Sequence, residues 1–124
     1  MSYLFSDIDG NIYSLNAKDG SQLWQFKAEN QTLSQIAVSG DIVYFQDSKD
    51  KLYALSLKDG KWLWHYKREI EKEQTMFGTS TPVIIENILY TGFSDGYFIA
   101  FNALTGNIIW ERELEGKKKL RDID

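Results

Sequence analysis

The stretch GNIYSLNAKDGSQLW at Gly10–Trp24 returns twice along the chain, as DKLYALSLKDGKWLW at Asp50–Trp64 and as GYFIAFNALTGNIIW at Gly96–Trp110. The tryptophans that end the three stretches lie 40 residues apart (24 to 64) and then 46 residues apart (64 to 110). A period of this length indicates a repeat architecture, in which one supersecondary unit is copied and each copy buries its apolar face against the next. The repeat therefore decides the fold.

Each copy of the stretch predicts a β-hairpin. A glycine stands four residues before each tryptophan, and an aspartate or threonine precedes that glycine. Such pairs between apolar runs indicate turns, because glycine supplies the positive φ that a tight turn needs. The predicted flanking strands are Ile12–Leu15 with Leu23–Lys27, Leu52–Leu55 with Leu63–Lys67, and Phe98–Phe101 with Ile108–Glu113.

Further strands precede each hairpin. A third strand is predicted at Tyr3–Ser6, Ile42–Gln46 and Ile88–Phe93, and a fourth, in two repeats only, at Leu33–Val38 and Ser80–Ile85. Four-stranded antiparallel units at this period are the blades of a β-propeller. We therefore expect an all-β fold: a propeller segment of about three four-stranded blades in an incomplete ring. A sandwich or barrel would not explain why Gly-x-x-x-Trp returns three times.

The expected organisation is a single domain over residues 1–124. Its repeats span approximately 1–30, 31–70 and 78–116, and 117–124 is expected to begin a further blade. The period lengthens at Lys67–Gln74, which we interpret as an insertion loop that could include a short helical turn.

The composition is that of one globular domain. The chain has 124 residues, of which 43% are hydrophobic, and this is enough for a core of its own. The net charge of −4 argues against nucleic acid or an anionic membrane surface as the main partner. The absence of cysteine excludes a disulfide framework, a thiolate nucleophile and a cysteine metal site.

The sequence carries no recognisable targeting or membrane-spanning segment. No apolar run approaches the length of a transmembrane span, and the first residues lack the charged start and apolar stretch of a signal peptide. Two interpretations stay open: a cytosolic protein, or a chain that begins after a targeting segment.

The pattern Ala-x-Asp/Thr-Gly-x-x-x-Trp resembles the tryptophan-docking motif of the pyrroloquinoline-quinone-like (PQQ-like) β-propeller family. The first and third copies fit the motif, whereas the middle copy has Leu57 at the alanine position. The resemblance implies that each tryptophan lies between adjacent blades and packs over a glycine turn of its neighbour. The structural docking residues are then Trp24, Trp64 and Trp110 with Gly20, Gly60 and Gly106.

Within this family the chain is similar to the lipoprotein propellers of the outer-membrane β-barrel assembly machinery. Residues 120–124 (LRDID) resemble a Leu-x-Asp-Val-Asp segment of those proteins, and residues 77–82 (FGTSTP) fall where they have Arg-Gly-Glu-Ser-Ala-Pro. The resemblance implies that Asp122 and Asp124 bind a protein partner. The Leu-x-Leu-Arg element of those proteins does not carry over, since residues 74–77 (QTMF) stand in its place, and of these Met76 and Phe77 are expected to contact the partner. A strand end with solvated carboxylates is the alternative reading of the two aspartates.

The function implied by this resemblance is a non-catalytic, protein-binding scaffold. The implied partner is a set of BamA-type POTRA domains, and the implied location is periplasmic, at the outer membrane, through the lipid anchor of a full-length parent. The alternatives are a fragment of a PQQ-dependent dehydrogenase or a generic PQQ-like ligand-binding or sensor domain. With three repeats and no cysteine pair, we expect no catalytic residue, no bound cofactor and no metal site.

Other candidate residues have plainer interpretations. The run Asp7-Ile8-Asp9-Gly10-Asn11 does not match the spacing of a calcium loop and predicts an Asx-capped turn. His65 lacks a surrounding serine–aspartate pattern and is expected to be a partly exposed strand residue. Trp62, two positions before Trp64, is expected on the same strand face, packed in the blade interface or exposed.

Three blades cannot close a ring, so uncovered apolar faces are expected at both ends. We therefore expect either a segment of a longer propeller or head-to-tail self-association.

Overall fold

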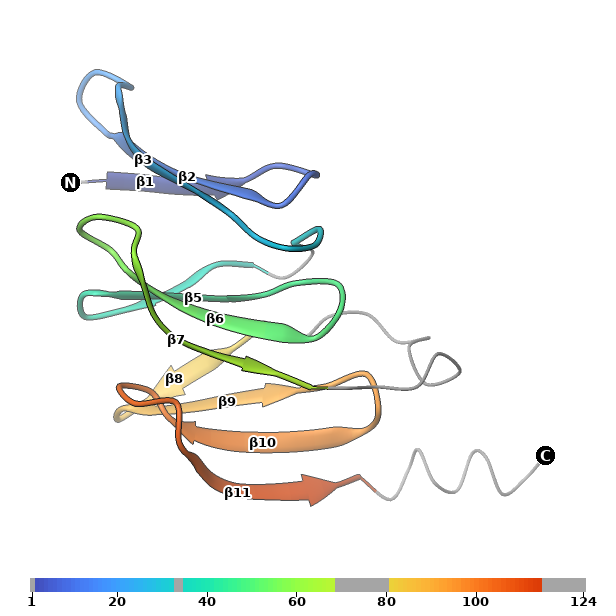
Figure 1. Cartoon of the computed structure of the whole chain (residues 1–124). Helices are drawn as coiled ribbons and strands as arrows, with labels where there is room; N and C mark the ends of the chain where they lie inside the picture. The colour runs from blue at the N-terminus through green and yellow to red at the C-terminus, as the bar shows by residue number, and fades with distance from the viewer. Residues whose placement is uncertain (1, 33–34, 69–80, 115–124) are drawn as a thin grey trace.

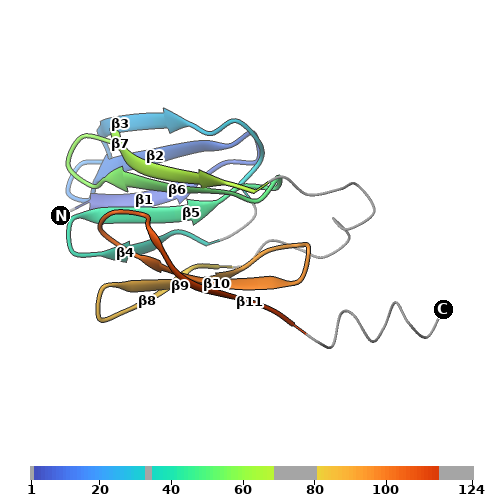
Figure 2. The same cartoon turned by 60° about the horizontal axis from the view of Figure 1, so that its bottom comes forward.

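The computed structural model describes residues 2–32, 35–68 and 81–114. These residues form three antiparallel sheets that follow one another in chain order, with the second sheet between the first and the third (Figure 1). In Figure 2 the first two sheets overlap and the third lies beneath them. The first sheet contains β1 (Ser2–Ser6), β2 (Asn11–Asn16) and β3 (Gln22–Lys27). The second contains β4 (Ala37–Ser39), β5 (Ile42–Gln46), β6 (Lys51–Ser56) and β7 (Trp62–Lys67). The third contains β8 (Val83–Ile85), β9 (Ile88–Gly92), β10 (Tyr97–Asn102) and β11 (Ile108–Glu113).

Each sheet is a meander in which every strand pairs with the next one along the chain. The strand order is β1-β2-β3 in the first sheet, β4-β5-β6-β7 in the second and β8-β9-β10-β11 in the third. The three sheets do not close into a ring, and no helix occurs in the part of the chain that the structure describes. The prediction of an all-β propeller segment with an incomplete ring is therefore confirmed. We refer to the sheets as blades 1, 2 and 3.

The core consists of two apolar layers, one in each gap between blades. Between blades 1 and 2 the layer contains the buried side chains of Ile12, Trp24, Ala28, Val43, Phe45, Tyr53 and Leu55. Between blades 2 and 3 it contains Ile42, Tyr44, Leu52, Ala54, Leu89, Phe93, Ile99, Phe101 and Ala103. Successive side chains of a strand point to opposite faces. Blade 2 therefore contributes alternate residues of β5 and β6 to both layers, so its inner strands are apolar on both sides.

A β-bulge corrects the expected position of Trp62. Trp64 pairs with Ala54, but Trp62 pairs with the next residue, Leu55, because the register shifts between Ala54 and Leu55. A bulge inserts one extra residue and so reverses the alternation of the strand. Trp62 therefore lies on the face opposite Trp64, where it is half exposed and stacks on the exposed ring of His65 at 4.4 Å between ring centroids. The expectation that it shares a face with Trp64 was wrong.

The fourth strands are shorter than the sequence predicts. β4 begins at Ala37 and β8 begins at Val83, so Gln35, Ile36, Thr81 and Pro82 precede them outside the strands. Of the two predicted strands, Leu33, Ser34 and Ser80 lie outside the described residues. Residues 69–74 of the expected insertion loop and residues 117–124 also lie outside them.

Ser14 is the one polar side chain under a tryptophan in the three equivalent positions. It pairs with Trp24, whereas Trp64 and Trp110 pair with Ala54 and Ala100. The hydroxyl of Ser14 is buried and has no hydrogen-bond partner. A buried hydroxyl without a partner destabilises the fold.

We therefore predict that Ser14→Ala raises the free energy of unfolding by about 1 kcal/mol. The reciprocal change Ala54→Ser, at the fully buried equivalent position, should lower it by about 1–3 kcal/mol for the same reason. Urea unfolding of both variants measures the two changes. A loss of stability in Ser14→Ala would contradict the prediction.

Candidate interaction site

The indole of Trp24 crosses from blade 1 to blade 2. Its Nε1 donates a hydrogen bond to the carbonyl oxygen of Leu57 at 2.8 Å, in the β6–β7 turn. Gly60 lies beneath the ring with φ of 76°, and a Cβ added at this glycine would stand 2.5 Å from the indole. No side chain fits in that space, so the turn accepts the ring only because residue 60 is glycine.

Trp64 makes the same contact between blades 2 and 3. Its Nε1 donates to the carbonyl oxygen of Ala103 at 3.0 Å, and a Cβ added at Gly106 would stand 2.6 Å from its ring. The hydroxyl of Tyr44 donates to the same carbonyl at 2.6 Å, and burial raises the pKa of Tyr44 to about 12. Two donors from blade 2 thus converge on one turn carbonyl of blade 3.

The remaining tryptophan and the remaining glycine of the motif have no such partner in the described part of the chain. Trp110 on β11 keeps 43% of its surface exposed, against 8% for Trp24, and contacts Tyr90 and Phe98 of its own blade. Gly20 in the β2–β3 turn has no atom within 4 Å of an added Cβ. Four of the six expected docking residues therefore form two tryptophan–glycine contacts, Trp24 with Gly60 and Trp64 with Gly106. The other two, Trp110 and Gly20, have no counterpart among the described residues.

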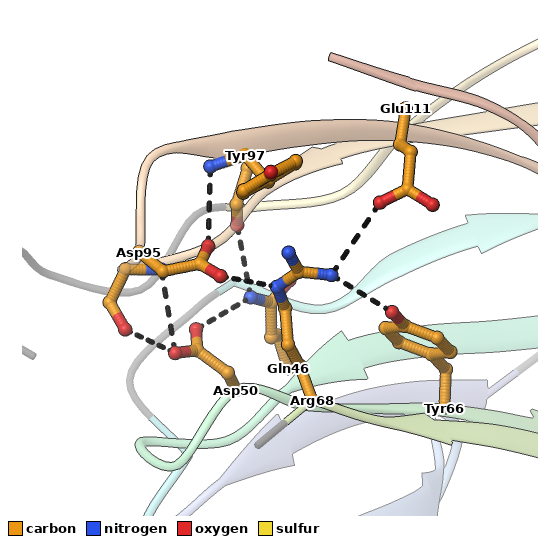
Figure 3. A network of polar contacts seen from close by, with 9 residues as sticks. Gln46, Asp50, Tyr66, Arg68, Asp95, Tyr97 and Glu111 are labelled. Atoms are coloured by element: carbon orange, nitrogen blue, oxygen red, sulfur yellow. Dashed lines mark hydrogen bonds and ion pairs between the residues drawn. The ribbon is translucent and has the colours of Figure 1, made fainter. Parts of the chain in front are cut away.

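A buried polar network joins blades 2 and 3 at the opposite end of the strands (Figure 3). Gln46, at the end of β5, accepts a hydrogen bond from the Thr91 hydroxyl at 2.7 Å and donates to the Gly92 carbonyl at 3.1 Å. Asp50 accepts hydrogen bonds from the Ser94 hydroxyl and from the side-chain amide of Gln46. Buried polar groups need such partners, so this network fixes how the two blades meet away from the tryptophans.

Arg68 extends this network toward the surface. Its Nε donates to Asp95 at 2.6 Å, its Nη1 donates to the Tyr66 hydroxyl at 3.1 Å, and Glu111 lies 3.8 Å from Nη1. The guanidinium also lies over the ring of Tyr97, 4.4 Å from its centroid, as Figure 3 shows. Only about 15% of the Arg68 side chain is exposed. A largely buried ion pair of this kind holds one geometry, because breaking it would leave a charge unpaired.

Blades 1 and 2 are joined at this end by a related but simpler contact. Lys51 is nearly buried, and its Nζ lies 2.9 Å from a carboxylate oxygen of Glu29, a residue that follows β3. The Tyr53 hydroxyl accepts the backbone N–H of Glu29 and donates to Asp47. The Lys51 ammonium forms the main hydrogen bond to Glu29 and holds the pKa of that carboxyl below its usual range.

The described residues that precede the two segments expected to bind a partner both contact one turn, the β9–β10 turn (Phe93–Gly96). Arg68, the last described residue before 69–80, bonds Asp95 in this turn. Leu114, the last described residue before 115–124, donates its backbone N–H to the Gly96 carbonyl at 2.9 Å. The expected partner-binding residues Met76, Phe77, Asp122 and Asp124 themselves lie outside the described residues.

Sequence reasoning did not identify the polar network. Gln46, Asp50, Thr91 and Ser94 each belong to a strand end or a turn that looks local in the sequence. A signal was present at position 46, because a glutamine that ends the apolar run IVYF needs a buried partner if the strand is covered on both sides. The run Asp7–Asn11 forms the expected Asx turn, with the Asp7 carboxylate accepting the backbone N–H groups of Asp9 and Asn11.

No group of three or more histidine, cysteine, aspartate or glutamate side chains among the described residues is placed to hold a metal ion. No helix within the same residues has the length and apolar character needed to cross a membrane.

Comparison with known proteins gives a family match, a related sequence and solved structures of the same fold. A family model described as "Outer membrane protein assembly factor BamB" matches residues 2–124. The outer membrane protein assembly factor BamB of Kangiella koreensis is 35% identical over 49 residues, which cover 40% of this chain and 13% of that protein.

The solved structures show the fold. BamB from Moraxella catarrhalis superposes with a TM-score of 0.82 at 21% identity, over 91% of this chain and 34% of that one. A europium-containing methanol dehydrogenase superposes with a TM-score of 0.76 at 17% identity, over 89% of this chain and 22% of that one. The chain thus spans about a third or less of the length of each of these proteins.

The two kinds of glycine turn provide a test of the indole contact. Gly20, Gly60 and Gly106 all have φ near +80°, so an alanine at any of them costs about 1–2 kcal/mol for its left-handed backbone. We predict that Gly60→Ala and Gly106→Ala lower the free energy of unfolding by a further ~1–3 kcal/mol, because the added Cβ displaces an indole. Gly20→Ala, with open space around it, should lack this second effect. Denaturant unfolding in dilute solution measures all three, and equal losses would contradict the indole contact.

Proposed function

The chain belongs to the family described as "Outer membrane protein assembly factor BamB", and from this premise we propose that it acts as a non-catalytic scaffold that binds another protein during outer-membrane β-barrel assembly. The observation that carries the proposal is the family match over residues 2–124, supported by the likeness of fold to BamB. The chain spans only part of the length of its relatives, so the proposal concerns the part of such a scaffold that this chain forms.

The proposed mechanism is the presentation of two segments from one rigid turn. Residues 69–80 and 115–124 follow Arg68 and Leu114, and both of these residues bond the β9–β10 turn. The Ser94 hydroxyl in this turn donates a hydrogen bond to Asp50, which holds the turn against blade 2. Binding residues on loops benefit from a rigid scaffold because less freedom is lost on binding. We propose Met76, Phe77, Asp122 and Asp124 as the residues that contact the partner.

The proposed partner is a BamA-type set of POTRA domains, and the proposed location is the periplasm, at the outer membrane. Both proposals follow from the resemblance to the assembly factor. The methanol dehydrogenase likeness, at 17% identity, concerns the fold alone and does not favour a quinoprotein enzyme. No observation on the described residues favours the dehydrogenase or sensor alternatives over the scaffold.

The experiment is a binding titration of the purified chain against purified POTRA domains, read by biolayer interferometry. We predict saturable binding by the unaltered chain. The double variant Asp122→Asn/Asp124→Asn and the double variant Met76→Ala/Phe77→Ala should each weaken it at least about tenfold, as the loss of a central contact does. Added salt should weaken binding of the unaltered chain more than that of the asparagine variant, because only the former carries the two charges.

The matched control is Asp41→Asn/Glu86→Gln. It removes two exposed carboxylates from the β4–β5 and β8–β9 turns, at the opposite end of the blades. This control should bind like the unaltered chain. An equal loss in the control, or no saturable binding by the unaltered chain, would overturn the proposed function.

A further inference from the structure

Blade 1 presents an outward face that copies a buried one. We call Tyr3, Phe5, Tyr13 and Leu15, with the Ala17 carbonyl and Gly20, the acceptor face. Each of its residues lies 40 positions before one that meets blade 1 from blade 2: Val43, Phe45, Tyr53, Leu55, Leu57 and Gly60. Phe45 is fully buried, whereas Phe5 keeps 38% of its surface exposed.

The acceptor face already has the internal arrangement of its buried counterpart. The rings of Phe5 and Tyr13 stack at 5.0 Å, as those of Phe45 and Tyr53 do at 4.8 Å. The Tyr13 hydroxyl donates to Asp7 at 3.1 Å, and the Tyr53 hydroxyl donates to Asp47 at the same distance. No rearrangement of these side chains is needed before docking.

Blade 3 presents the complementary half of the contact. We call Ile88, Tyr90, Phe98, Ala100 and Trp110 the donor face. These residues lie 46 positions after those with which blade 2 meets blade 3: Ile42, Tyr44, Leu52, Ala54 and Trp64. Trp64 and Tyr44 donate their hydrogen bonds to one turn carbonyl, that of Ala103. Among the residues that the structure describes, Trp110 and Tyr90 have no such acceptor.

We propose that the donor face of one copy of this chain docks on the acceptor face of a second copy. The Trp110 ring then covers Gly20, and its Nε1 and the Tyr90 hydroxyl reach the Ala17 carbonyl. This is the contact that the chain makes twice within itself, and among the described residues Trp110 and Gly20 are the two halves left without a counterpart. Exposed apolar patches of this kind mark association surfaces, and a contact between two different faces is heterologous, joining copies head to tail.

The junction between copies differs from the internal junctions at one position. Phe26 of blade 1 packs edge-on against Phe45 and Tyr53, and Tyr66 packs in the same manner against Phe101. The equivalent residue of blade 3 is Arg112, which pairs with Phe98 on the donor face. Its guanidinium meets the stacked Phe5 and Tyr13 rings beside the Asp7 carboxylate, a cation–π contact with an opposite charge nearby. The proposal concerns these two faces and is independent of the proposed function.

Sedimentation velocity across the micromolar range tests the proposal. The weight-average sedimentation coefficient of the unaltered chain should rise with its concentration. Trp110→Ala removes the donor ring, and Gly20→Ala places a methyl group where that ring must lie. Each should raise the dissociation constant at least about tenfold. Gly40→Ala is the matched control, because Gly40 also has positive φ and open space but lies in the β4–β5 turn; it should associate like the unaltered chain.

Mixing the two variants gives a sharper test. Trp110→Ala retains an intact acceptor face, and Gly20→Ala retains an intact donor face, so the equimolar mixture should form a dimer with one junction although neither variant associates alone. Circular dichroism checks that both variants remain folded. A chain that stays monomeric throughout, association that persists in both variants, or a mixture that stays monomeric would each overturn the proposal.

Discussion

The structure depends on one contact, an indole ring that crosses from a blade to the glycine turn of the next. Trp24 and Trp64 each meet such a turn, and in both cases an added Cβ would stand within 2.7 Å of the ring. The contact combines a large apolar area with a hydrogen bond from Nε1 to a turn carbonyl, so it defines position as well as supplying energy. The repeated sequence pattern exists because this contact needs glycine at one place and tryptophan four residues later. The tryptophan of one blade packs on the glycine turn of the next, so both residues need a neighbouring blade to make this contact.

A second contact at the other end of the strands keeps neighbouring blades from pivoting about the indole. Between blades 2 and 3 it is the network from Gln46 and Asp50 to Arg68, and between blades 1 and 2 it is the pair of Lys51 with Glu29. The indole contacts are nearly identical in the two gaps, whereas the polar contacts are not. The end of the blades that holds Arg68 and Leu114 is therefore also the end where each pair of blades has its own polar contacts. A recurring frame with non-recurring attachments is the arrangement expected of a repeat protein that binds through its loops.

The sequence was sufficient for the fold because the informative residues recur. The distances between Trp24, Trp64 and Trp110, with a glycine before each, specify both the strands and the order in which they pack. Features that do not recur could not be read in this way. The side of the sheet on which Trp62 lies depends on a bulge, and the strand alternation gives no sign of it. The partners of Gln46 in blade 3 lie 45 and 46 residues away, across the gap between the blades, so no local pattern marks them. The residues proposed to bind a partner rest on resemblance alone, since they fall outside the described part of the chain.

The unequal covering of the three blades follows from the same contact. Every residue of β5 in the middle blade is buried, whereas the equivalent strand β9 of blade 3 has two buried residues and β1 of blade 1 has none. In a repeat protein each unit is stabilised by its nearest neighbours, so a blade covered on both faces is held more firmly than one covered on a single face. Blade 2 is thus the fixed element, and it grips the β9–β10 turn of blade 3 through Asp50 and Arg68. A partner on the donor face would cover blade 3 on its second side, as blade 2 is already covered on both. Blade 3, and with it the β9–β10 turn, would then be held more firmly.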